Sequence, residues 1–187
     1  EAPALAPAGV FGPRLAGSPA EARARAWAEK MLKAQKFDAV RIEEFKVPYW
    51  TRTFDRAAVT APAPQNLVVT ALGGSGPTPE GGVEAELVRL TSLNELRAVD
   101  AEKVKGKIVF INEPTTRTQD GNGYGVGVLK RGMCAPVAQG KGAAACLIRS
   151  VGTHSHRFAH QGGPARAREG ATLPAAAVSP PDAEQLT

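Results

Sequence analysis

Two short apolar runs with a helical segment between them constrain the fold of this chain most strongly. The runs cover residues 107–111 and 143–148, and a helix is expected between them at about residues 126–139. A strand, a helix and a second strand in this order predict two parallel strands joined by a right-handed crossover. Continuous apolar runs of this length are typical of central strands that are covered on both faces. The sequence therefore predicts a sheet with at least one parallel pair of strands.

Residues 18–36 are expected to form an amphipathic helix. Ser18 can cap its N-terminus, Pro19 suits the first turn, and Glu21 completes a capping box. Apolar side chains then recur at helical spacing with charged residues between them. A strand is expected next, at residues 40–47, because apolar and polar residues alternate roughly there until Pro48.

The remaining elements give the expected fold class. Further strands are expected at residues 57–60, 66–72, 84–90 and 173–178, with a short helix at 92–99 and the start of another after Ser179. The expected class lies between α/β and α+β and is β-rich. We place a domain boundary between residues 55 and 56, so that a second part covers residues 56–187. Because the last helical pattern is cut off at Thr187, we expect this second part to be truncated.

Composition argues against some classes of partner. The net charge is +5, but the basic residues are scattered and form no stripe, so a nucleic-acid partner is not expected. No apolar run of 18 residues occurs, so a membrane-spanning helix is not expected. Cys134 and Cys146 can form a disulfide in an oxidising compartment. The position of Cys146 in an apolar run favours a free thiol that packs as a small hydrophobic side chain.

Several motifs occur in order along nearly the whole chain. They are GPRLAGSP at 12–19, KGKIVFIN at 105–112, GKGAAACLIRSVGT at 140–153 and LPAAAVSPPDAEQL at 173–186. This series resembles the N-terminal part of the co-catalytic zinc exopeptidases of the carboxypeptidase Q (plasma glutamate carboxypeptidase) type. The resemblance implies that residues 1–55 are the first helix and strand of a zinc-peptidase α/β domain. It implies that residues 56–187 are a protease-associated insert domain.

Two positions depart from the pattern of that family. Pro136 stands where relatives carry a Gly-Ala-rich helix, so we expect this helix to be kinked or shortened. Where relatives resemble PHTG, this chain has Ala159, His160, Gln161 and Gly162. His160 therefore matches the family motif only as a single position.

The resemblance also implies an activity for the parent protein. Such enzymes hold zinc with His, Asp and Glu side chains that follow the insert, and this chain lacks those motifs. We therefore expect a parent zinc exopeptidase, of unknown terminal preference, that acts on short peptides. We expect the 187-residue chain alone to be inactive and to bind no zinc. The missing peptidase domain, or a second copy of the chain, is expected to cover the helix at 18–36. A secreted or periplasmic location is implied.

All three histidines of the chain, His154, His156 and His160, lie within seven residues. Imidazoles at this spacing can chelate zinc or copper from a loop, bind metals adventitiously, or belong to an ordinary polar loop. The resemblance adds a further role, in which the loop faces the peptidase site. Arg149, Ser150 and His160 are then the expected substrate contacts.

Two other classes of function remain open at the level of sequence. The first is a stand-alone, non-catalytic module that binds a protein or a peptide. The second is a small metal-binding protein that uses the histidine loop. The latter predicts stoichiometric metal binding that is lost in the variant His156→Ala.

Overall fold

The computed structural model describes residues 8–163 and 173–186. The chain divides into two compact units, Glu1–Thr51 and Arg52–Thr187, which are considered separately below. None of the helices in these described ranges is long and apolar enough to cross a lipid bilayer. This division does not test which domain each part represents, so the domain identities expected from the sequence stay predictions.

The first unit is built around one long helix. Helices α1 (Ala8–Phe11) and α2 (Pro19–Ala34) pack through the rings of Phe11 and Trp27, whose centroids are 6.1 Å apart. The Ser18 hydroxyl accepts a hydrogen bond of 3.1 Å from the Glu21 backbone N–H, as the capping pattern predicts. The helix ends just before Lys36, which adopts a left-handed backbone conformation with φ 61°.

The prediction of a strand at residues 40–47 is wrong. This segment is extended but joins no sheet, and Phe45 in it is 82% exposed. A strand requires a neighbour that completes its backbone hydrogen bonds. The described residues of the first unit contain no second strand that could do so.

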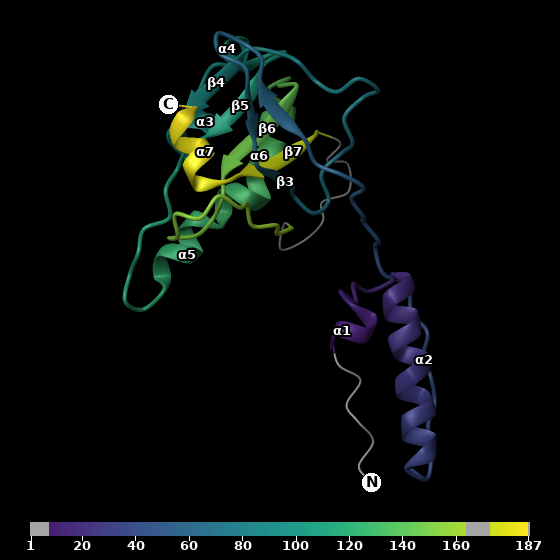
Figure 1. Cartoon of the computed structure of the whole chain (residues 1–187). Coiled ribbons are helices and arrows are strands. Elements are labelled where there is room, and N and C mark those ends of the chain that lie inside the picture. The colour runs from purple at the N-terminus through teal and green to yellow at the C-terminus, as the bar shows by residue number, and fades with distance from the viewer. Residues whose placement is uncertain (1–7, 164–172, 187) are drawn as a thin grey trace. The chain divides into compact units, whose positions relative to one another are not determined.

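The second unit contains a mixed five-stranded sheet (Figure 1). Its strands, in spatial order, are β3 (Val69–Ala71), β7 (Ala175–Val178), β6 (Ala145–Arg149), β5 (Ile108–Ile111) and β4 (Leu87–Leu90). Strand β3 is antiparallel to β7, whereas β7, β6, β5 and β4 are mutually parallel. The predicted parallel pairing of the two apolar runs is therefore confirmed.

A separate antiparallel hairpin precedes the sheet. It consists of β1 (Ala57–Val59) and β2 (Gln65–Leu67), and the Ala61–Pro62 peptide bond in its turn is cis. The single strand expected at residues 66–72 is thus two strands in two sheets. The break falls at Val68, whose backbone N–H bonds to the Asp182 carboxylate instead of to a strand.

Helices cover both faces of the five-stranded sheet. Helices α3 (Leu93–Ala98), α4 (Ala101–Val104) and α6 (Leu129–Gly140) contribute buried residues to one face, and α7 (Pro180–Gln185) does so on the other. Helix α5 (Asn122–Gly127) packs on α6. Val109 and Ile111 face a core shared with α3 and α6, whereas Phe110 packs with Ala183 of α7. This explains why β5 reads as a continuous apolar run. Helices include more of the described residues than strands do, so the β-rich part of the expectation is wrong.

A disulfide joins α6 to β6. Cys134 and Cys146 are both fully buried, and their Cα atoms are 6.2 Å apart, within the usual range for a disulfide. The prediction of a free thiol at Cys146 is therefore wrong. Helix α6 continues past Pro136 to Gly140, so the proline does not shorten it there. Packing of α6 against β6 offsets the backbone hydrogen bond that proline cannot make.

Candidate functional site

The candidate site lies where two loops leave the parallel part of the sheet. One loop follows β5 and the other follows β6, so both begin at the carboxyl edge, where α/β sheets commonly bind ligands. The two loops enclose an open pocket of about 260 Å³. Its lining residues are Pro114, Thr115, Arg117, Arg149, Gly152, Thr153 and His154.

A hydrogen bond between the backbone of one loop and a side chain of the other links the two loops. The Gly152 N–H donates to the Thr115 hydroxyl oxygen at 3.0 Å. Gly152 has φ 151°, a conformation that side chains rarely adopt, and a Cβ there would lie 3.1 Å from His154 Cδ2. Glycine is therefore required where the second loop turns toward the first.

Arg149 is fixed at the end of β6 by two partners. Its Nη1 lies 2.6 Å from a carboxylate oxygen of Glu184 and donates to Asn112 Oδ1 at 3.3 Å. The side chain is 15% exposed, while the Glu184 side chain is 63% exposed. The sequence-predicted Arg149 thus lines the pocket with a defined orientation.

Ser150 and His160, the other two expected substrate contacts, meet each other. The Ser150 hydroxyl accepts a hydrogen bond of 2.8 Å from the His160 backbone N–H. Ser150 is only 1% exposed, so its hydroxyl positions the loop in this structure. Direct contact of either residue with a substrate stays a prediction.

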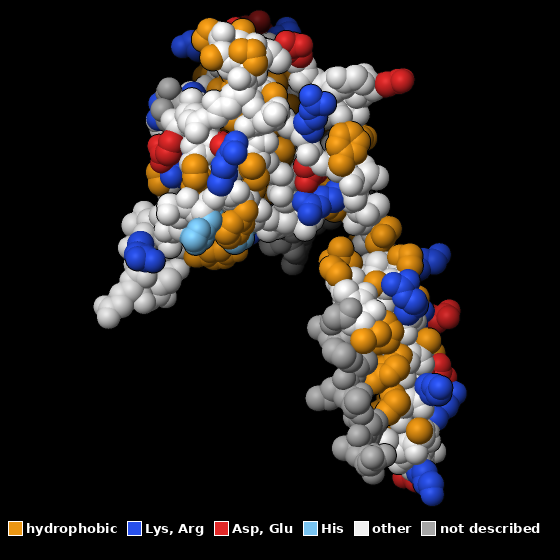
Figure 2. Space-filling model, viewed as in Figure 1, with side chains coloured by type: hydrophobic (Ala, Val, Ile, Leu, Met, Phe, Trp, Pro, Cys, Tyr) orange, Lys and Arg blue, Asp and Glu red, His pale blue; other side chains and the backbone are white. Residues whose placement is uncertain are grey.

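The three histidines and Phe158 form a cluster of aromatic rings. The His154 ring stacks on Phe158 with centroids 4.5 Å apart, and the His160 ring meets both edge-on. Figure 2 shows histidine side chains on the surface of the second unit beside hydrophobic ones. Among the described residues, no group of three or more His, Cys, Asp or Glu side chains is arranged to hold a metal ion.

Within this cluster, the imidazole of His154 is difficult to protonate. Burial lowers its pKa below the ordinary value, and the neighbouring His160 and His156 lower it further. Its Nδ1 also accepts a hydrogen bond of 3.2 Å from the His156 backbone N–H, which requires that nitrogen to be unprotonated. The stack is therefore built around a neutral imidazole.

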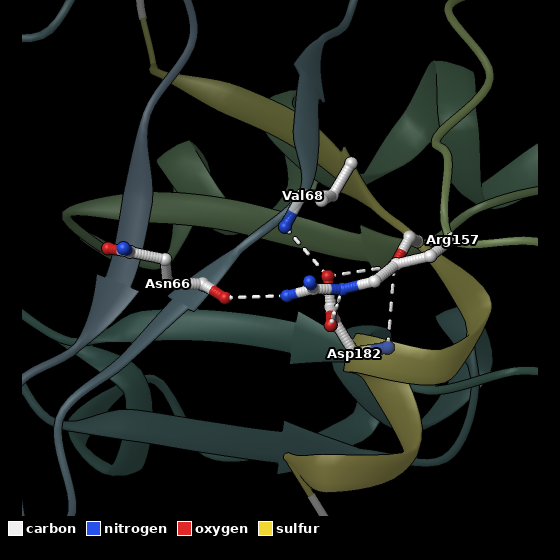
Figure 3. Close-up of polar contacts among 5 residues, drawn as sticks. Asn66, Val68, Arg157 and Asp182 are labelled. Atoms are coloured by element: carbon white, nitrogen blue, oxygen red, sulfur yellow. Dashed lines mark hydrogen bonds and ion pairs between the residues drawn. The ribbon is translucent and has the colours of Figure 1, made fainter.

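A buried carboxylate anchors the histidine loop to the rest of the unit (Figure 3). Asp182 is fully buried and accepts from the Val68 N–H at 2.7 Å, the Ser179 hydroxyl at 2.8 Å and Arg157 Nε at 2.8 Å. Arg157 also donates to the Asn66 carbonyl at 2.9 Å. Burial alone would raise the pKa of Asp182, but these hydrogen bonds hold it below the ordinary value.

A buried lysine lies close to the pocket. Lys130 of α6 is fully buried, and its Nζ donates to the Glu113 carbonyl in the loop after β5. Burial is the main reason why the pKa of Lys130 is lowered to about 8. The negative charge of Glu113 opposes this shift, whereas the positive charges of Arg149 and Arg131 add to it. The pocket thus has a buried cation behind its wall.

Sequence reasoning missed five residues of this region: Thr115, Arg117, Lys130, Arg157 and Asp182. Asp182 had a usable signal, because it stands three residues after the helix-capping Ser179. The other four carry no local pattern that distinguishes them from ordinary surface or helix residues.

The comparisons with known proteins agree with the family resemblance. No family model matches the chain. Carboxypeptidase Q of Xenopus laevis is 36% identical over 178 residues, which are 95% of this chain and 36% of that protein. This chain is homologous to carboxypeptidase Q. It spans little more than a third of the length of these curated carboxypeptidase Q relatives.

Solved structures extend this homology to the fold. The crystal structure of a peptidase M28 precursor from Shewanella amazonensis has a TM-score of 0.85 and 44% identity. The match covers 96% of this carboxypeptidase Q homologue and 40% of that chain. A zinc aminopeptidase of Bacillus subtilis has a TM-score of 0.59 and 22% identity over 95% of this chain and 37% of its own. The mixed α/β unit is therefore similar to the corresponding part of M28 peptidases.

Proposed function

We propose that the chain is the N-terminal segment and the protease-associated insert of a zinc-dependent exopeptidase that hydrolyses short peptides. The observation that carries this proposal is the 36% identity with carboxypeptidase Q across 95% of the chain. Zinc would be held by residues outside this sequence, in keeping with the family resemblance. The chain alone would then lack peptidase activity.

In this proposal the second unit shapes access to the substrate. Its pocket opens at the carboxyl edge of β5 and β6, between loops that are fixed by hydrogen bonds. Arg149 and His160 would meet the peptide from this edge. Ser150 and the Arg157–Asp182 pair would keep the histidine loop in place.

The first unit would complete the peptidase domain. No residue of α2 is buried, and Leu32 on this helix is 41% exposed. Ile42 and Phe45 of the extended segment are also exposed. Large apolar side chains in contact with water favour a covering partner. The peptidase sheet would be that partner, with a second copy of the chain as the alternative.

The disulfide supports a secreted or periplasmic location. The bond between Cys134 and Cys146 requires an oxidising environment if it is to persist. Free thiols at both positions in protein purified from its native source, without reductant, would contradict this part of the proposal.

The activity is tested on the protein as its native cells produce it, alongside this 187-residue chain. We expect the native protein to be much heavier than 19.5 kDa and to hydrolyse dipeptides until a zinc chelator is added. We expect no such hydrolysis from the 187-residue chain. A native mass near 19.5 kDa would instead favour a stand-alone binding module, and chelator-sensitive turnover by the chain alone would refute the division of roles.

A further inference from the structure

The pocket between the two loops has a marked excess of positive charge. Its lining includes the guanidinium groups of Arg117 and Arg149 and contains no carboxylate. Among the described residues, Glu184 alone forms an ion pair with either arginine, and its side chain is largely exposed. Lys130 adds a buried positive charge close to Arg149.

Arg117 is the second arginine that lines the pocket. Its side chain is exposed, and it forms no hydrogen bond or ion pair with any residue that the structure describes. Arg149, in contrast, is oriented by Glu184 and Asn112. The pocket therefore combines one fixed guanidinium with one that is free to turn toward a ligand.

We propose that this pocket binds a small oxyanion between Arg117 and Arg149. A guanidinium presents several N–H donors in a planar fork, which matches the two oxygens of a carboxylate or two oxygens of a phosphate. The ligand would be either the carboxylate of a short peptide or free phosphate, which share this chemistry. The bound charge would also offset the buried cation of Lys130, whose only hydrogen-bond partner in the described part of the chain is a carbonyl.

The proposal does not depend on peptidase activity, because binding is measured on the 187-residue chain itself. Amide resonances are followed by NMR while three probes are added in turn: N-acetyl-dialanine, its C-terminal amide, and inorganic phosphate. We expect Thr115, Gly152 and Thr153 to shift and to saturate in the millimolar range with at least one of the two anions. The neutral amide should produce no saturable shift at these positions.

Two matched variants test the role of the free arginine. Arg117→Gln should raise the dissociation constant of the anion about tenfold, because one charge-assisted contact is lost. Arg97→Gln removes the same charge from the exposed face of α3, outside the pocket, and should leave the dissociation constant unchanged within about twofold. Both side chains are exposed, so neither variant is expected to disturb folding.

Each outcome decides a specific point. Saturation by the peptide acid alone assigns the site to a peptide carboxylate, whereas saturation by phosphate alone assigns it to a free anion. Absence of saturable shifts with both anions, or equal shifts with the acid and its amide, would refute the oxyanion site. Equal weakening in the two variants would also refute it, because binding would then follow net charge only. A negative result here would leave the proposed peptidase role untouched.

Discussion

Replacement of Asp182 by alanine should destabilise the second unit strongly. The carboxylate is fully buried and accepts hydrogen bonds from the Val68 N–H, the Ser179 hydroxyl and Arg157 Nε. Truncation would remove the acceptor for all three donors at once. The loss would fall on the point where β2, β3, α7 and the histidine loop meet (Figure 3).

The size of the effect follows from the exposure of each donor. A buried donor left without a partner costs about 1–3 kcal/mol, and the Ser179 hydroxyl and the Val68 N–H are the two inner donors. The Arg157 side chain is 54% exposed and can turn to water, so its loss contributes about 1 kcal/mol or less. We therefore expect Asp182→Ala to lower the free energy of unfolding by about 2–7 kcal/mol.

Urea unfolding followed by circular dichroism measures this difference. Both tryptophans, Trp27 and Trp50, belong to the first unit, so fluorescence would not report on the second. Asp100→Ala is the matched control, because Asp100 is an exposed N-cap of α4 and its loss should cost only about 1 kcal/mol. If the two variants are destabilised equally, Asp182 is not the centre of a buried network.

Three further perturbations test the same account of the fold. Because the pKa of Asp182 is lowered in the folded state, its stabilisation is complete above the unfolded value of about 3.9 and is lost as the pH falls through the lower folded value. The difference in unfolding free energy between wild type and Asp182→Asn should therefore shrink below about pH 4. Reduction of the Cys134–Cys146 disulfide should lower the free energy of unfolding by about 3 kcal/mol, measured by urea titration with and without reductant. Gly123→Ala should lower the melting temperature, because its Cβ would clash with the backbone carbonyl oxygen of Thr116. Gly125→Ala, with open space around it in the same helix, should leave the melting temperature unchanged or raise it.

Local patterns in the sequence were enough to predict several elements. The capping serines Ser18, Ser92 and Ser179 each accept the expected backbone N–H at the start of a helix. The buried strands β5 and β6 were also predicted, because both of their faces are apolar. These signals lie within a few residues of the elements that they specify, so a single sequence contains them.

Contacts between distant residues account for what the sequence did not reveal. The segment at residues 40–47 alternates like a strand, but pairing depends on a partner that alternation cannot supply. Arg157 meets Asp182, and Thr115 meets Gly152, across long stretches of chain that carry no shared motif. The histidine loop was identified as a candidate site, but its stacked rings and its anchoring depended on these distant contacts.

Helix α7 positions two side chains of the candidate site from outside the pocket. Asp182 in this helix holds the histidine loop through Arg157, and Glu184, two residues later, orients Arg149. Ala183, between them, packs on the sheet against Phe110, so the helix is docked by its apolar residue and acts through its neighbours. Because successive residues of a helix point in different directions, one short helix can fix both a loop and a pocket arginine. Displacement of α7 should therefore disturb the wall of the pocket that is formed by the end of β6 and the loop after it, although no residue of α7 lines the pocket.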